Sequence, residues 1–181
     1  MMGTLARPLD ALSLFLFRLA LIGAVAAVLV MVFSAGWQVI ARYALNAPPI
    51  WTEELARRAM VWAGMLGASC AFRAQADPVL FPKARDVTGA AGNALVLVRL
   101  VGVILFSAPV IWFSLFDGRM NIARGFLGRS AMRQAEMLDV PMIWFTVAVP
   151  LAFVIIIIHA LSETATRLSG QMPVSPLKSE G

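Results

Sequence analysis

Residues 42–58 read RYALNAPPIWTEELARR, a charged and proline-punctuated stretch between two apolar runs. Each of its two glutamates is followed four residues later by an arginine, the order in which a glutamate stabilises a following cation on a helix. The prolines at 48 and 49 prevent a helix from starting much earlier, and glutamates in a first turn suit the positive end of the helix dipole. The stretch therefore predicts a helix that begins near Trp51, with Thr52 as its N-cap and four charges in its first two turns.

The composition is far more apolar than that of a soluble domain, with 60% hydrophobic residues, 14% charged residues and a mean hydropathy of +0.82. The net charge is +5, but the basic residues are scattered singly or in pairs and form no run of the kind that binds nucleic acid. Contact with lipid headgroups at loop ends explains the basic excess better. The composition therefore indicates an integral membrane protein without a nucleic-acid partner.

Four segments are expected to cross the membrane as helices. The uncharged run 19–41 would make about 34 Å of helix, which exceeds a hydrocarbon core of about 30 Å. The second apolar run, 59–72, is too short at about 21 Å and spans only if its helix starts near Trp51. A charge at the bilayer centre costs about 2.5–3.5 kcal/mol, so the four charges must lie at one membrane rim, paired or against another protein. The expected fold is all-α, with spans at about 19–41, 51–72, 89–116 and 140–161.

The remaining segments complete the expected organisation. Residues 1–18 are expected to form an N-terminal cytoplasmic segment, 19–161 the four-helix membrane domain, and 162–181 a disordered C-terminal tail. The long connection before the fourth span is expected to contain a short interfacial helix around 130–138. A signal peptide cleaved near residues 24–26 is the competing interpretation of the N-terminus, but the apolar run continues well past that site.

The tryptophans predict where the membrane boundary lies, whereas the basic residues give little information on which side is cytoplasmic. Trp37, Trp51, Trp112 and Trp144 fall where spans meet the first and third loops, which predicts one aromatic belt on that face. Lysine and arginine are divided almost evenly between the two sides, and the positive-inside rule favours a cytoplasmic N-terminus only slightly.

Groups that could support catalysis are scarce. The sequence has no HExxH or Cys/His cluster and no GxSxG, Walker or dinucleotide motif, so no catalytic, metal-binding or cofactor-binding residue is expected. His159, the single histidine, is expected at the membrane interface, and Cys70, the single cysteine, in ordinary packing. Arg99 is expected to extend toward the near end of its span. Since the polar residues of the spans form no evident substrate pathway, the sequence predicts a scaffold that packs against a larger protein.

Two groups of residues carry a resemblance to a known family. They are Arg42-Tyr43, Asn46, Pro48, Trp51-x-Glu53-Glu54-Leu55-x-Arg57, Trp62 and Gly67 around the second span, and Leu138-x-Val140-Pro141-Met142-x-Trp144-Phe145 with Pro150 at the fourth. This pattern resembles the small membrane subunit (DctQ-like) of tripartite ATP-independent periplasmic (TRAP) transporters, over about residues 15–160. It departs after the second span, where the family often has a basic-glycine-histidine phrase and this chain has RAQADP at 73–78.

The resemblance implies a non-catalytic subunit that binds a large, multi-span permease subunit in the bacterial inner membrane. It implies that the large subunit holds the substrate and sodium sites, and that a periplasmic solute-binding protein delivers the substrate, typically an organic acid. Both termini would be cytoplasmic. The alternatives are a membrane anchor or assembly subunit of another complex, such as a redox complex, and a stand-alone channel or exporter.

The partner interface is expected around the charged stretch. Its candidate residues are Arg42, Tyr43, Asn46, Trp51, Glu53, Glu54, Arg57, Arg58, Trp62, Gly64 and Gly67. The two glycines begin small-xxx-small pairs with Ala68 and Ala71, which allow close contact between helices. The alternative is an ordinary helix start at the membrane interface, whose exposed ion pairs would each contribute only about 0.3–0.5 kcal/mol.

Overall fold

A computed structural model describes residues 2–76 and 87–170 of the chain, with side chains from residue 6 onward. The elements are α1 (Met2–Tyr43), α2 (Trp51–Ala74), α3 (Gly89–Leu115), the 3-10 helix η2 (Ile122–Arg124), α4 (Phe126–Ala131), α5 (Ile143–Thr146) and α6 (Ala148–Leu168). The described residues contain no strand, only one isolated bridge between Gln134 and Pro141. The predicted all-α fold is therefore confirmed.

Three helical segments are long and apolar enough to cross a membrane. They are Ala6–Tyr43, Gly89–Leu115 and Ile143–Leu168, the last comprising α5 and α6. α2 is not one of these three, because its first two turns carry the charges of Glu53, Glu54, Arg57 and Arg58. α2 does begin at Trp51, as predicted from the prolines and the charge spacing.

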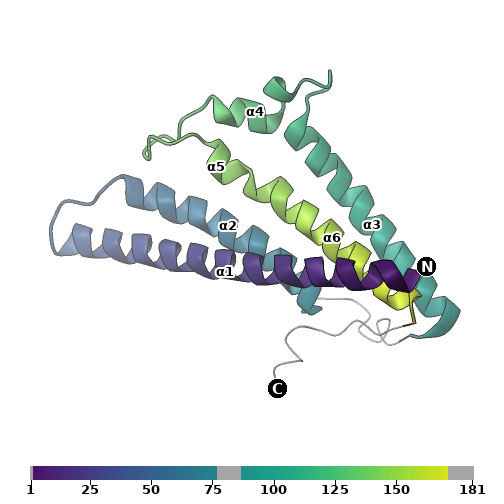
Figure 1. The fold of residues 1–181 in the computed structure, drawn as a ribbon. Helices are drawn as coiled ribbons and strands as arrows, with labels where there is room; N and C mark the ends of the chain where they lie inside the picture. Colours follow the sequence, from purple (N-terminus) through teal and green to yellow (C-terminus); the bar gives the residue numbers. More distant parts are fainter. Residues whose placement is uncertain (1, 77–86, 171–181) are drawn as a thin grey trace.

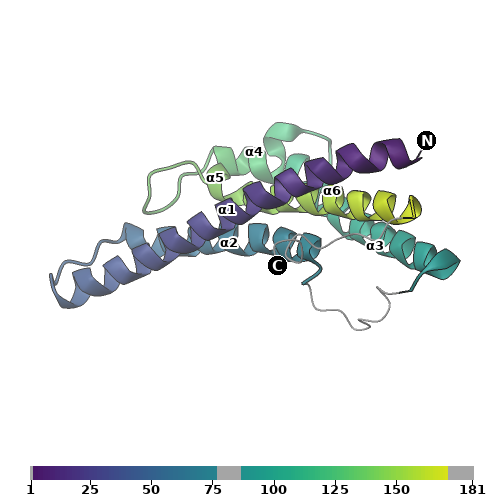
Figure 2. The same ribbon diagram turned by 60° about the horizontal axis from the view of Figure 1, so that its bottom comes forward.

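The helices form a fan rather than a closed bundle (Figures 1 and 2). α1 and α2 make a long antiparallel hairpin, α6 packs against both, and α3 packs mainly against α6. The first part of α1 lies beside the ends of α2 and α6, and the first part of α3 lies beside the end of α6; we call this the converging end. The opposite end carries the α1–α2 connection, α4 and α5, and we call it the spread end.

The apolar core lies between α1, α2 and α6. Phe17, Ala20 and Ala24 of α1 are buried at helical spacing against Leu66 and Cys70 of α2 and Ile155 of α6. An added Cβ at Gly23 would lie 2.8 Å from Leu66 Cδ1, so the glycine permits this close approach of α1 and α2. Cys70 thus occupies the packing position expected for it. The other faces of α1 expose large apolar side chains, as lipid contact requires.

The helix ends differ from the expected ones in two places. α1 begins at Met2 instead of near residue 19, so the described part of the N-terminal segment is helical. α6 extends to Leu168, and the expectation of a disordered tail from residue 162 is wrong for its first seven positions, 162–168. Ser162 and Glu163 are buried and make polar contacts with α1 and α3, which stabilise these extra turns. Residues 171–181 lie outside the described residues.

Local details also differ from the sequence predictions. Ile50 occupies the N-cap position of α2, and Thr52 lies inside the first turn, where its hydroxyl donates to the Pro49 carbonyl at 2.8 Å. Thr52 as the N-cap is therefore wrong. The short helix is α4 at Phe126–Ala131 instead of 130–138, because a backbone bond from Met142 N to Arg133 O turns the following residues into a hairpin-like connection. In the segment 73–78, where the chain differs from the family pattern, residues 77 and 78 lie outside the described residues.

Candidate functional site

The candidate residues between Glu53 and Gly67 are divided between two faces of α2. Glu54, Arg58 and Trp62 recur every four residues and point toward α5 and the connection before it, and we call them the inward face. Glu53 and Arg57 lie on the opposite side, together with Gly64 and Gly67, and we call these four the outward face. The helical period explains this division, because neighbouring glutamates are separated by about 100° around the axis.

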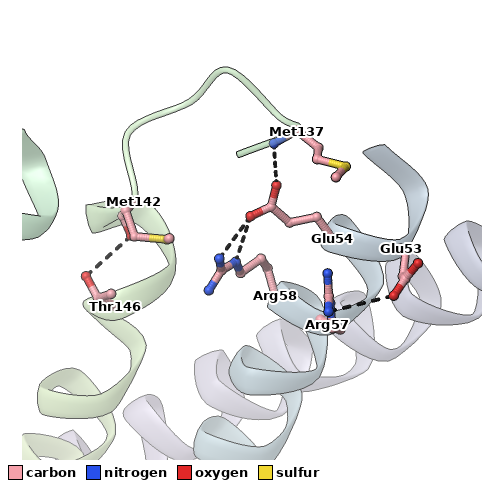
Figure 3. A network of polar contacts seen from close by, with 7 residues as sticks. All are labelled: Glu53, Glu54, Arg57, Arg58, Met137, Met142 and Thr146. Carbon is pink, nitrogen blue, oxygen red and sulfur yellow. Dashed lines mark hydrogen bonds and ion pairs between the residues drawn. The ribbon is translucent and has the colours of Figure 1, made fainter. Parts of the chain in front are cut away.

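Glu54 joins the start of α2 to the connection before α5 (Figure 3). Glu54 is only 3% exposed, and its carboxylate accepts hydrogen bonds from Arg58 Nη2 at 2.9 Å and Nε at 3.3 Å. The other carboxylate oxygen accepts from the backbone N–H of Met137 at 2.7 Å. One carboxylate therefore satisfies a guanidinium on its own helix and a backbone amide 83 positions later in the chain.

The rest of the inward face continues this contact along α2. The guanidinium of Arg58 lies 5.7 Å from the ring centre of Phe145, a distance at which a cation is attracted to an aromatic face. Further along, Trp62 Nε1 donates to the backbone carbonyl of Trp144 at 2.9 Å. The inward face thus holds α5 against α2 by polar contacts within the chain.

The outward face makes few contacts within the chain. Glu53 and Arg57 form an ion pair at 3.7 Å, and their side chains are 60% and 65% exposed, so the pair stabilises the helix little. An added Cβ at Gly64 or Gly67 would meet nothing within 4 Å. This face therefore leaves room for another helix to approach closely.

The other candidate residues lie around the spread end of the α1–α2 hairpin. Arg42, Tyr43, Asn46 and Trp51 are all exposed, Tyr43 to 78%. Asn46 has a φ of 51°, a left-handed conformation that asparagine tolerates better than most residues, and it turns the chain after α1. Trp51, three positions before Glu54 and seven before Arg58, lies on the same side of α2 as the inward face.

A second polar cluster, at the converging end, is not evident from the sequence pattern. Arg73 Nη2 at the end of α2 contacts Asp10 Oδ1 of α1 at 2.5 Å, and the same oxygen accepts from Ser162 Oγ of α6 at 3.1 Å. This contact ties α1, α2 and α6 together through one carboxylate.

Arg99 completes the cluster from α3. Its Nη1 donates to both carboxylate oxygens of Glu163 on α6, at 2.9 and 2.7 Å, and its guanidinium lies 4.3 Å from the ring centre of Phe72 on α2. The extension of Arg99 toward the near end of its span stays a prediction, and the structure adds Glu163 of α6 as the partner of its guanidinium.

His159 also belongs to this cluster instead of the membrane interface. It is 1% exposed, and its Nδ1 lies 2.7 Å from Ser13 Oγ of α1. The interfacial position expected from its place near the span end is wrong, because α6 continues for about two more turns beyond it. The only signal in the sequence was the presence of Asp10, Ser13 and Glu163 within about two and a half turns of the expected span ends.

The family model for tripartite ATP-independent periplasmic transporters, DctQ component, matches residues 31–170. The chain belongs to the DctQ family. The match includes all of α2, α3 and α6 and the spread end of α1, so it contains both the inward and the outward face. Comparison with curated proteins gives no match.

Membership of the DctQ family confirms the resemblance read from the charged stretch and the fourth span. It also confirms that this DctQ is a transporter component and not an enzyme. Across 2–76 and 87–170, no group of three or more His, Cys, Asp or Glu side chains could hold a metal ion.

Proposed function

We propose that this DctQ is the scaffold on which a large permease subunit assembles in a sodium-coupled TRAP symporter of the bacterial inner membrane. The large subunit would hold the substrate and sodium sites, and a periplasmic binding protein would deliver an organic acid. The observation that supports the scaffold role is the division of α2. One face is satisfied within the chain, while the opposite face combines an exposed ion pair with open glycines.

We propose that α2 is a fourth span, in addition to the three apolar helices. Its 24 residues make about 36 Å of helix, and it lies along α1 and α6 over most of its length. Glu54 and Arg58 are paired on the inward face. Of the four charged residues in the first two turns of α2, only Glu53 and Arg57 are mostly exposed, at the spread end. Four spans would place both termini on one side, the cytoplasmic side, and the first and third loops outside.

The outward face, the end of α1 and the α1–α2 connection would together form the docking surface. Gly64 and Gly67 would allow a helix of the large subunit to approach, and Glu53 and Arg57 would pair with its polar groups at the rim. Arg42, Tyr43 and Asn46 would extend this surface beyond the membrane boundary. Glu54, Arg58 and Trp62 would act indirectly, by holding the spread end in the shape that the partner recognises.

Co-purification with the large subunit tests this assignment through two matched glycines. Gly64 of α2 and Gly102 of α3 are both exposed, and a Cβ added at either position meets nothing within 4 Å, so the two sites are matched for a leucine substitution. Gly64→Leu is expected to lower recovery of the large subunit and substrate uptake at least about tenfold, since it fills the space needed for close helix contact. Gly102→Leu is expected to leave both unchanged.

Two results would contradict the proposal. Equal recovery of the large subunit with both leucine variants would remove the outward face from the interface. Transport of an organic acid by the purified chain, reconstituted without any other subunit, would replace the scaffold role by a channel or carrier role.

A further inference from the structure

The connection from Phe116 to Met142, which we call the arch, is folded tightly onto the end of α3. An added Cβ at Gly125 would lie 2.2 Å from the Leu115 carbonyl oxygen, so only glycine allows this approach of the two backbones. Asp117 Oδ1 accepts from the backbone N–H groups of Arg119 at 2.8 Å and Asn121 at 3.0 Å. These contacts fix the turns of the arch, and the side chains it exposes therefore have defined positions.

The arch lies at the expected membrane boundary. The ring of Trp112, in the last turn of α3, packs on the ring of Phe116 with centroids 4.9 Å apart. Trp144 follows the arch and is 65% exposed. Tryptophans at both ends of a connection between two candidate spans are typical of a segment that rests at headgroup level.

The outer surface of the arch combines an excess of positive charge, four exposed arginines against the exposed carboxylates of Glu136 and Asp139, with apolar side chains. Its exposed arginines are Arg119, Arg124, Arg129 and Arg133, and its exposed apolar side chains include Met120, Ile122, Phe126 and Met132. One arginine, Arg129, donates to the backbone carbonyl of Arg124 at 2.9 Å. The guanidiniums of the other three form no salt bridge with the carboxylates of the described residues. This interleaving of cations and large apolar groups is typical of segments that lie in a membrane interface.

We propose that the arch binds anionic phospholipid, with Arg119, Arg124 and Arg133 contacting headgroup phosphates. The planar guanidinium matches the geometry of phosphate oxygens and is more weakly hydrated than an ammonium. Met120, Ile122, Phe126 and Met132 would enter the boundary between headgroups and acyl chains. A lipid surface fits better than an acidic protein because belt tryptophans flank the arch on both sides. The proposal does not depend on the scaffold role.

Lipid selection by the full-length chain tests the proposal. The protein is reconstituted in nanodiscs of phosphatidylcholine with and without phosphatidylglycerol, and the lipids that stay bound after detergent extraction are counted by native mass spectrometry. The natural chain is expected to retain phosphatidylglycerol in preference to phosphatidylcholine, and salt is expected to weaken this preference. The triple variant Arg119→Gln/Arg124→Gln/Arg133→Gln is expected to lower the preference at least about fivefold.

Two controls keep the test specific. The matched triple variant with lysine at the same positions keeps the charge and is expected to retain most of the preference. Far-ultraviolet circular dichroism is expected to show equal helix content in all variants, because the three guanidiniums make no ion pair within the described fold. An unchanged preference in the glutamine variant would overturn the proposal. If that variant also loses binding to the secreted binding protein, the arch would instead be assigned to an acidic protein partner.

Discussion

The two ends of this DctQ use charged residues in opposite ways. At the converging end, Asp10, Arg73, Arg99 and Glu163 pair across four different helices, and every one of these contacts lies within the chain. At the spread end, α2 directs one pair inward and leaves the other at the surface. The charges of the converging end are thus satisfied by one another across the helices, whereas the spread end leaves one ion pair of α2 at the surface.

The physical reason for the difference is burial. A buried pair is maintained only where its geometry and added hydrogen bonds offset the desolvation of both charges. Arg99 meets this condition through two bonds to Glu163 and the ring of Phe72. The Glu53–Arg57 pair, which is mostly exposed, costs little to form and contributes little, and it is free to exchange partners.

The largest expected effect comes from breaking the pair at the converging end. Glu163→Leu removes the carboxylate that Arg99 contacts and is expected to lower the free energy of unfolding by about 3–5 kcal/mol. Thermal unfolding of the detergent-solubilised chain would measure this loss. The double variant Arg99→Leu/Glu163→Leu is the control and is expected to recover most of the stability. A single variant no less stable than the double variant would contradict the organising role of this end.

The next effect separates the neighbouring glutamates of the charged stretch. Glu54→Ala removes the acceptor for Arg58 and for the Met137 amide, and is expected to cost about 1–3 kcal/mol and to speed tryptic cleavage after the exposed Arg133. Glu53→Ala on the outward face is expected to change stability by less than about 0.5 kcal/mol. Equal losses from both variants would show that the two faces do not differ.

A smaller effect is expected at the far end of the inward face. Trp62→Phe keeps an aromatic ring but removes the N–H that donates to the Trp144 carbonyl. The loss of one neutral hydrogen bond is expected to cost about 0.5–1.5 kcal/mol, measured by thermal unfolding. A matched Trp37→Phe change, on an exposed face of α1, should be nearly silent. If Trp37→Phe has the larger effect, the contact between Trp62 and Trp144 does not hold α5.

The smallest effect concerns the arch and depends on pH. The backbone N–H groups of Asn121 and Arg119 donate to Asp117 and lower the pKa of its carboxyl below the ordinary value. Its stabilising contribution is therefore present above the ordinary pKa and is lost as the pH falls through the lowered value. Nuclear magnetic resonance of the Arg119 and Asn121 amides should show faster hydrogen exchange, relative to other exposed amides, once Asp117 is protonated. An Asp117→Asn variant should lack this pH dependence.

Much of the helical framework could be predicted from the sequence. The start of α2 at Trp51 follows from Pro48 and Pro49, and the apolar runs of α1, α3 and α6 give their approximate positions. The pairing of Glu54 with Arg58 also follows from helical spacing. These features were accessible because each depends on residues that are close together in the chain.

The contacts between distant residues could not be predicted. Arg99 and Glu163 are 64 positions apart, and nothing in either local sequence identifies the other as its partner. Glu54 accepts a hydrogen bond from the backbone of Met137, and a backbone amide leaves no signal in residue types. The sequence predicts an interfacial His159 because its apolar run ends at residue 161, whereas α6 continues to Leu168 and buries the polar residues of these extra turns.

The central claim is that the outward face of α2 contacts the large permease subunit, whereas the exposed surface of α3 faces lipid. A photo-reactive amino acid placed at Arg57, or in a separate variant at Val98 of α3, which is 70% exposed, tests it directly in membranes containing both subunits. Irradiation is expected to give a covalent adduct with the large subunit from position 57 and none from position 98. An adduct from position 98 with none from position 57 would contradict the account.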